Sequence, residues 1–258
     1  MSQPPHLSLV RSPEHAKVRN RLLATLSEDD YNLLKPRLEH VSLERGDVLI
    51  EPNQPFEHIY FLENGITSIV AIAPDGHRIE VGIHGCEGMS GVSILLGVDT
   101  TPHQTFIQIA GPALRIPVET FRAMIRESRT LHEHLLKYVQ VFNVQMAHTA
   151  LSHGAYTMEA RLARWLLMCH DRLDGDDIPL IHEFIALMLG VRRAGVTERM
   201  HILEGVKAVK TARGLITVLD RNKLEEAAGD IYGVPEAEYE RIIGPFRKAG
   251  QGARPALP

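Results

Sequence analysis

Cysteine is scarce in this 258-residue sequence, which has only Cys86 and Cys169, far apart and without the spacing of metal ligands. This scarcity excludes a disulfide framework and predicts a reducing compartment. No run approaches the roughly 18 apolar residues of a membrane span, and residues 1–10 lack the basic and apolar segments of a signal peptide. We therefore expect a cytoplasmic protein without a membrane partner.

Positive charge is not in excess either. The formal net charge is −4 and charged residues make up 23% of the chain, so the composition does not indicate a nucleic-acid-binding protein. Hydrophobic residues make up 44%, which is enough for the core of one large or two ordinary domains. Because the net charge is negative, any basic surface must be confined to one region of the chain.

Recognisable catalytic patterns are absent as well. No glycine-rich phosphate loop follows a strand, and no nucleophile, base and orienting group occur at an enzyme's spacing. The 14 histidines leave a cupin-like metalloenzyme as an alternative, because a β-roll with clustered histidines can hold a metal. However, His77, His84 and Glu87 do not supply that ligand pattern. We expect no enzyme, no metal and no cofactor.

Short runs of strand-forming residues, separated by turns, are present between residues 45 and 117. Asp75-Gly76 between two of these runs is a strong hairpin signal. The pattern predicts an antiparallel, jelly-roll-like β-roll in an α+β protein. The predicted strands are 48–50, 58–62, 67–72, 78–83, 105–109 and 113–116.

Helical patterns follow at 118–125, from about 130 onward, and at 156–173. The long middle helix has an apolar stripe with two interpretations. It is either a face packed on its own domain or the seam of a homodimer, because the helix stands between two domains. Cys169 lies on the buried side of the next helix as a small core residue. The dimer interpretation assigns the seam to Leu131, Leu135, Phe142 and Met146.

Residues 182–189 and 192–204 are two helical patterns separated by Gly190, which is helix-turn-helix spacing. Gly190 can adopt the positive φ of a sharp turn. Beyond them, 208–210 and 215–219 flank a glycine-containing turn as a two-stranded wing. Residues 191–213 contain six basic side chains and only two acidic ones. The local basic stripe predicts DNA binding, although six cations also occur on ordinary solvated helix faces.

The chain resembles the catabolite activator and fumarate-nitrate regulator (CRP/FNR) superfamily over residues 22–220. This resemblance implies a β-roll sensor domain, a long connecting dimer helix and a C-terminal winged helix-turn-helix. It also implies a homodimeric transcription regulator on a two-fold symmetric site in double-stranded DNA, with RNA polymerase as a further partner. The motifs that carry it are Tyr60-Phe61-Leu62-Glu63-Asn64-Gly65, Gly88-Met89-Ser90-Gly91-Val92, and His182-Glu183-Phe184 through Leu203-Glu204-Gly205.

The resemblance assigns Arg193 to the position of a guanine-reading arginine, whose fork fits the O6 and N7 acceptors of guanine. Ala194 and Glu198 replace the family's usual acidic and second basic base-reading residues, so the target sequence should differ. Arg199 replaces a small or apolar inward residue. The predicted DNA-binding residues are Arg192, Arg193, Thr197, Glu198, Lys207, Lys210 and Arg213.

The implied effector pocket lacks the groups that bind a cyclic nucleotide in this superfamily. Those members use a Glu for the ribose and an Arg-Ser pair for the phosphate, whereas Val92 and residues 101–105 supply neither here. A buried phosphate would have no cation. We therefore expect an unknown effector other than cyclic AMP, or else a degenerate sensor on a constitutive DNA binder. The candidate pocket residues are Ser93, His103 and Gln104.

The N-terminal cysteine cluster of the superfamily's iron–sulfur sensors is absent too, which excludes that cofactor. Cys86 lies in a glycine-flanked turn, and this predicts an exposed thiol. Such a thiol is either redox-active or an unreactive loop cysteine.

The sequence divides into five predicted parts. An N-terminal extension (1–20) precedes the β-roll (21–117) and the connecting helices (118–154). The winged helix-turn-helix (155–246) includes an extension of two short helices expected to pack on this last domain. Residues 247–258 are expected to form a disordered tail.

Overall fold

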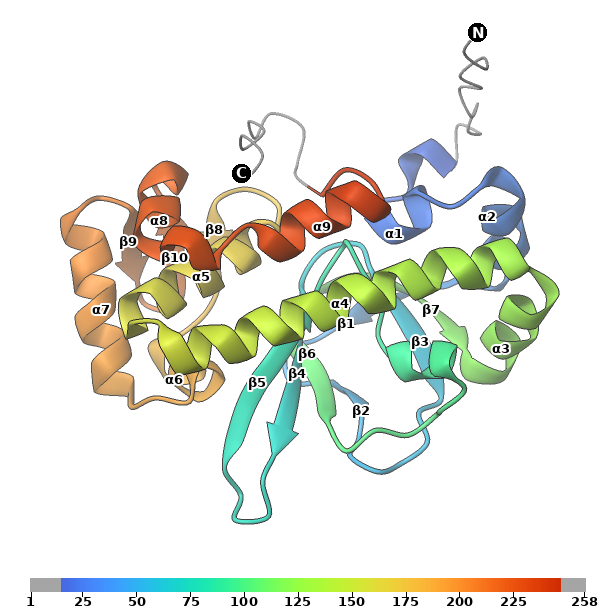
Figure 1. Cartoon of the computed structure of the whole chain (residues 1–258), viewed down its shortest axis with the longest axis horizontal. Helices are drawn as coiled ribbons and strands as arrows, with labels where there is room; N and C mark the ends of the chain where they lie inside the picture. Colours follow the sequence, from blue (N-terminus) through green and yellow to red (C-terminus); the bar gives the residue numbers. More distant parts are fainter. Residues whose placement is uncertain (1–14, 247–258) are drawn as a thin grey trace, which may run out of the picture.

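The computed structural model describes residues 15–246, and its centre is a β-roll of two antiparallel sheets (Figure 1). One sheet has the strand order β1-β7-β3 and the other β2-β6-β4-β5. The strands are β1 (Glu39–Leu43), β2 (Val48–Ile50), β3 (His58–Leu62), β4 (Ile66–Ile72), β5 (Arg78–His84), β6 (Gln104–Ile109) and β7 (Gly111–Pro117).

Strand β1 is the part of the roll that the sequence analysis missed. It pairs only with β7, at the edge of its sheet, and of its five side chains only Leu43 is buried. An edge strand with exposed polar side chains lacks the apolar alternation that marks a strand in the sequence. The predicted hairpin at Asp75-Gly76 joins β4 to β5, and Gly76 has a φ of +84°.

Two helices connect the roll to the last domain. Helix α3 (Val118–Glu127) ends at Ser128, whose hydroxyl accepts a hydrogen bond from the backbone N–H of Leu131 at 3.1 Å and so caps α4 (Arg129–Ala155). Helix α4 runs across the molecule from the α3 end to the last domain (Figure 1). None of the described helices is both long and apolar enough to cross a membrane.

The last domain is a winged helix-turn-helix. Its helices are α5 (Met158–His170), α6 (His182–Leu189), α7 (Arg193–Gly205) and α8 (Arg221–Ala228), and its small sheet has the order β8 (Asp177–Ile178), β10 (Leu215–Val218), β9 (Val209–Ala212). Gly190 ends α6 with a φ of +63°, as its place in the turn requires. The predicted α+β architecture, with its β-roll, long helix and winged helix-turn-helix, is confirmed.

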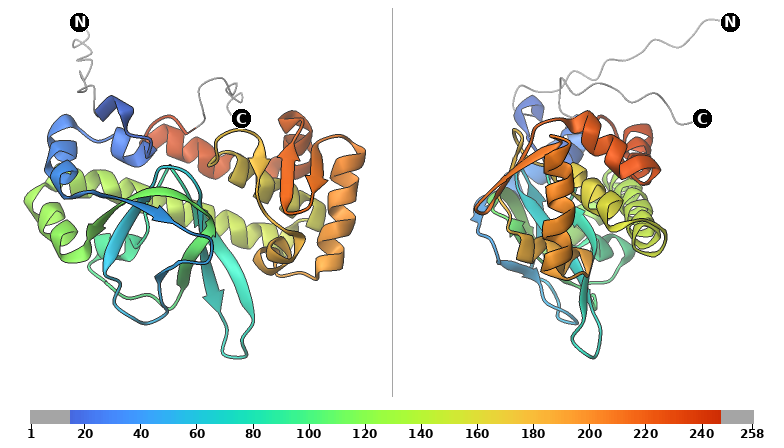
Figure 2. Two further views of the ribbon diagram at one scale, coloured as in Figure 1. Left: turned by 180° about the vertical axis from the view of Figure 1, so that it is seen from behind. Right: turned by 90° about the vertical axis from the view of Figure 1, so that its left-hand side faces the viewer.

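The first and last helices of the described residues lie near each other. Helices α1 (Arg21–Ala24) and α2 (Glu28–Leu34) lie near α9 (Val234–Ile242) (Figures 1 and 2). Helix α8 packs on α5, as expected of the C-terminal extension, whereas α9 lies along α4, with its Glu236 near Arg164 of α5. The proposed tail (247–258) and most of the proposed N-terminal extension (1–20) lie outside the described residues.

The core is continuous between the roll and the last domain. One cluster joins β-roll residues such as Ile66 and Ile83 to Leu162 and Leu166 of α5, all fully buried. Burying a leucine fully stabilises the fold by about 1.5–3 kcal/mol. The helix-turn-helix is therefore held against the roll by a shared apolar interface.

The apolar stripe of α4 packs on its own domain, which is one of the two interpretations of the sequence. Leu131 and Leu135 are 0% exposed and Phe142 is 6% exposed, within the chain itself. Met146 is half-buried and lines a cavity described below. The seam assignment of Leu131, Leu135 and Phe142 is therefore corrected, because side chains already covered within the chain cannot contact a second copy in this conformation, and that of Met146 stays a prediction.

Candidate nucleic-acid interface and ligand cavity

Helix α7 lies at the outer end of the molecule, away from the roll (Figures 1 and 2). Its inward side is apolar: Val196, Met200 and Leu203 are all fully buried. The opposite side leaves Ala194 and Glu198 exposed. This amphipathic pattern fixes which face of the helix can reach a DNA groove.

The amino end of α7 presents the predicted base-reading residues. Arg193 keeps 64% of its side chain exposed, and its Nε lies 2.9 Å from Oε1 of Glu183 on α6. Arg192 precedes it as the exposed N-cap residue. The Thr197 hydroxyl, one turn later, donates to the Arg193 carbonyl at 3.2 Å and is also 3.1 Å from Nδ1 of His182. An exposed arginine in a weak surface ion pair remains available to another acceptor.

The wing is the β9–β10 hairpin. Lys210 is exposed on β9, and Arg213 is exposed beside Gly214, which has a φ of +75° at the turn. Glu204 of α7 fastens the wing to the helix by accepting hydrogen bonds from Thr211, at 2.7 Å from its N–H and 2.5 Å from its hydroxyl. The Thr211 bonds lower the pKa of the Glu204 carboxyl.

The predicted DNA-binding residues thus fall into two groups. Arg192, Arg193 and Thr197 gather at the amino end of α7, with Glu198 beside them and 3.6 Å from Arg199. Lys207 follows the opposite end of the helix, about 20 Å away for 13 residues at a rise of ~1.5 Å each. Lys207 is therefore grouped with the wing cations Lys210 and Arg213 and not with the residues at the amino end of α7.

A cavity of about 200 Å³ lies between the sheet that contains β4, β5 and β6 and helix α4. Ser93 and His103, two of the three residues predicted for the effector pocket, line it. Gln104, the third, does not line this cavity. Its side chain turns to the outer side of the sheet, where it bonds with Arg78 and, at 3.2 Å, with Glu51.

His84 is the cavity residue that the sequence analysis missed. It ends β5, is only 2% exposed and lines the cavity, yet its Nε2 has no hydrogen-bond partner among the described residues. Burial, and to a smaller extent the charge of Arg172, lowers the pKa of His84 to about 3. The sequence placed His84 next to a turn and carried no sign of its burial.

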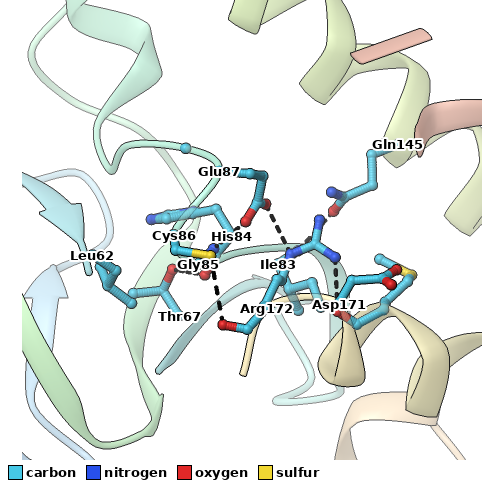
Figure 3. Close-up of polar contacts among 12 residues, drawn as sticks. Leu62, Thr67, Ile83, His84, Gly85, Cys86, Glu87, Gln145, Asp171 and Arg172 are labelled. Atoms are coloured by element: carbon cyan, nitrogen blue, oxygen red, sulfur yellow. Dashed lines mark hydrogen bonds and ion pairs between the residues drawn. The ribbon is translucent and has the colours of Figure 1, made fainter. Parts of the chain in front are cut away.

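Cys86 is buried, with 6% exposure, so the predicted exposed thiol was wrong. Its Sγ donates to the backbone carbonyl of Arg172 at 3.6 Å (Figure 3). The glycine beside it allows this close approach, because a Cβ at Gly85 would lie 2.9 Å from the Arg172 Cβ. No three His, Cys, Asp or Glu side chains within residues 15–246 are grouped to hold a metal ion.

A buried ion pair joins the 84–88 loop to the end of α5 (Figure 3). Oε1 of Glu87 accepts from Nε of Arg172 at 2.8 Å, and both side chains are 2% exposed. Burial alone would lower the pKa of Arg172, but the nearby Glu87, Asp171 and Glu236 carboxylates outweigh it and raise the pKa. The hydroxyl of Tyr239 on α9 donates to the Glu87 carbonyl at 3.0 Å.

A second polar contact crosses the same interface at Glu80 on β5. Its carboxyl accepts from Nε1 of Trp165 on α5 at 2.7 Å and from the Ser68 hydroxyl at 2.5 Å. Burial raises the pKa of Glu80 to about 7, although both hydrogen bonds oppose the shift. The β-roll and α5 are therefore linked by polar groups as well as by the apolar core.

Two family models match the chain in the order of its two domains. The cyclic nucleotide-binding domain matches residues 40–128, and the Crp-like helix-turn-helix domain matches residues 160–227. Together they cover more than half of the chain. The chain belongs to the CRP/FNR superfamily of transcription regulators.

This CRP/FNR protein has similar curated relatives and similar solved structures. It is 27% identical to the global nitrogen regulator of Synechococcus elongatus over 220 residues, which are 78% of this chain and 94% of the relative. The structure resembles FixK2 from Bradyrhizobium japonicum, with a TM-score of 0.65, 15% identity and coverage of 74% of this chain and 98% of that one. For a CRP-family regulator from Thermus thermophilus, the TM-score is 0.60, the identity 20% and the coverage 74% and 97%.

Proposed function

We propose that this CRP/FNR-type transcription regulator binds a two-fold symmetric DNA site as a homodimer in the cytoplasm, catalyses no reaction, and responds to an effector other than cyclic AMP. The exposed amino end of α7, together with the basic wing that is bonded to the carboxyl end of the same helix, is the observation that carries DNA binding. RNA polymerase is the partner through which such a regulator would activate transcription.

The exposed side of α4 is the surface we propose for dimerisation, in place of the buried stripe. Gln140, Ala147 and Leu151 are exposed there at helical spacing, with Leu151 46% exposed. This side faces away from the roll, which covers the opposite stripe of the same helix. If the α4 helices of two copies paired along this side, the two α7 helices of the dimer could enter successive major grooves of the DNA.

The cavity supports an effector other than cyclic AMP. Val92 stands where the superfamily's nucleotide binders have a ribose-binding Glu, and no Arg or Lys lines the cavity. A buried phosphate would therefore lose its hydration without gaining a cation.

DNA footprinting combined with analytical ultracentrifugation tests the proposed function. We expect a dimer at micromolar concentration and a symmetric footprint with half-sites roughly one helical turn, about 34 Å, apart. A monomer whose footprints lack symmetry would refute the proposal.

Arg193→Ala is expected to weaken binding to the preferred site by about 1–3 kcal/mol and to relax the preference at one base pair of each half-site, because a bidentate contact to guanine is lost. Affinities for a base-scanned site measure this effect. Equal weakening on every base variant would show that Arg193 contacts only the DNA backbone.

Lys210→Ala is expected to weaken binding to all sequences alike, because an exposed wing lysine would contact phosphate. Its loss should reduce the slope of log affinity against log salt concentration by about one per subunit. Titrations at several salt concentrations measure this slope, and Lys35→Ala, at an exposed position directly after α2 and outside the last domain, is the matched control that should leave it unchanged.

A further inference from the structure

We infer that the cavity beneath α4 binds an uncharged, mainly apolar small molecule that forms a hydrogen bond with Nε2 of His84. The inference rests on the proposed function in one respect, namely that this molecule is the effector of the regulator. Its chemical class follows from the walls of the cavity.

The size of the cavity suits a substituted ring or a molecule of similar bulk. Its volume is about 200 Å³, and an apolar cavity of roughly 150 Å³ is sufficient for benzene. Most of its wall is apolar. The apolar lining residues are Ile50, Ile69, Met89, Val92, Leu96, Val139, Phe142 and Met146.

The charge of the molecule is limited by the same walls. None of the lining residues is Asp, Glu, Lys or Arg. A buried carboxylate or phosphate would have no cation beside it, and a buried ammonium would have no carboxylate, so either would lose its hydration without compensation. An uncharged molecule has no such cost.

The polar groups of the cavity provide the specificity. Nε2 of His84 is buried, faces no hydrogen-bond partner among the described residues, and belongs to an imidazole that stays neutral at pH 7. Nδ1 of His103 is also buried and unpartnered within the described part of the chain. Ser93, Thr101, Thr105 and Asn143 add side chains that can donate or accept. A ligand with one or two polar atoms would satisfy these groups.

The occupant would touch both the sheet and the connecting helix. Val139, Phe142, Asn143 and Met146 are contributed by α4. Phe142 packs directly on the β5 backbone, because a Cβ at Gly82 would lie 2.9 Å from its ring. One turn later, Oε1 of Gln145 accepts from the N–H of Ile83 at 2.9 Å (Figure 3). A ligand here therefore contacts the helix that leads to the DNA-binding domain.

Matched pairs of small probes test the charge selectivity. Benzamide and benzoate share one ring and differ in charge, and so do indole and indole-2-carboxylate. Ligand-observed NMR at pH 7 with the full chain is expected to show binding of benzamide and indole, and at least tenfold weaker binding of both carboxylates and of cyclic AMP.

Three variants locate the binding. His84→Phe keeps the ring volume and removes the hydrogen bond, so it should weaken both uncharged probes at least tenfold. Asn143→Trp, at an exposed position on the rim of the cavity, should block entry without disturbing the core. His77→Phe at the exposed tip of the β4–β5 hairpin is the control and should change nothing.

Several outcomes would overturn the inference: no uncharged probe binds, the carboxylates or cyclic AMP bind as tightly, or binding is equal in all three variants. The symmetric DNA footprint is measured without any probe. If no symmetric footprint is found, the proposed function is refuted, but the proposed ligand class of the cavity is not. If the footprint is found and no uncharged probe binds, only the proposed ligand class is refuted.

Discussion

Glu87→Ala is expected to lower the free energy of unfolding by about 3 kcal/mol, because it leaves the buried guanidinium of Arg172 without its main partner. Breaking a buried ion pair costs roughly 3–5 kcal/mol. The lower end applies here, since Asp171 and Glu236 still lie near the same charge. Urea denaturation followed by circular dichroism measures the change.

Two comparisons make the Glu87 result specific. The double variant Glu87→Leu with Arg172→Met replaces the pair with apolar side chains of similar size and should recover most of the lost stability. Glu39→Ala breaks a surface pair, in which Glu39 lies 3.1 Å from Arg115 with 57% of its side chain exposed, and should cost less than about 1 kcal/mol. If Glu87→Ala costs no more than Glu39→Ala, the buried pair does not stabilise the domain contact.

Glu80→Gln is expected to remove a pH dependence of stability. The pKa of Glu80 is about 7 in the folded protein and about 4.3 in an unfolded chain. Because the folded state holds the proton more tightly, its stability is greatest below about pH 4.3 and falls as the pH rises through 7. At ~1.36 kcal/mol per pKa unit, the full loss is about 4 kcal/mol.

Urea denaturation between pH 5 and pH 8 measures this effect. The free energy of unfolding of the unmodified protein should fall over this range relative to that of Glu80→Gln, whose amide stays neutral and can still accept from Trp165. Glu119→Gln, on the exposed side of α3, is the control and should follow the unmodified protein. Parallel curves for Glu80→Gln and the unmodified protein would show that Glu80 is ionised in the folded state.

The order of elements was predictable from the sequence because it is set by local patterns. Alternation marks the buried strands of the roll, and helical periodicity together with Gly190 marks the helix-turn-helix. The edge strand β1 was missed because most of its side chains are exposed. Direct coverage of α4 by α9 could not be predicted, since nothing in either helix alone specifies its partner.

The residues of the cavity were only partly predictable. Neighbouring residues on a strand face opposite sides of the sheet, so that Gln104 points outward while Thr105 lines the cavity. The burial of Cys86 went unrecognised for a related reason. A glycine-flanked turn indicates exposure, but the missing Cβ of Gly85 equally permits the end of α5 to pack directly on the loop.

The bond between Trp165 and Glu80 makes the protein a spectroscopic reporter of its own domain contact. Trp165 is the single tryptophan of the chain, it is 3% exposed, and it lies where α5 meets the roll. Fluorescence excited selectively in tryptophan therefore comes from one buried indole at that boundary. Separation of the DNA-binding domain from the roll would admit water to this ring and shift its emission to longer wavelength, so the opening can be followed in solution without an attached dye.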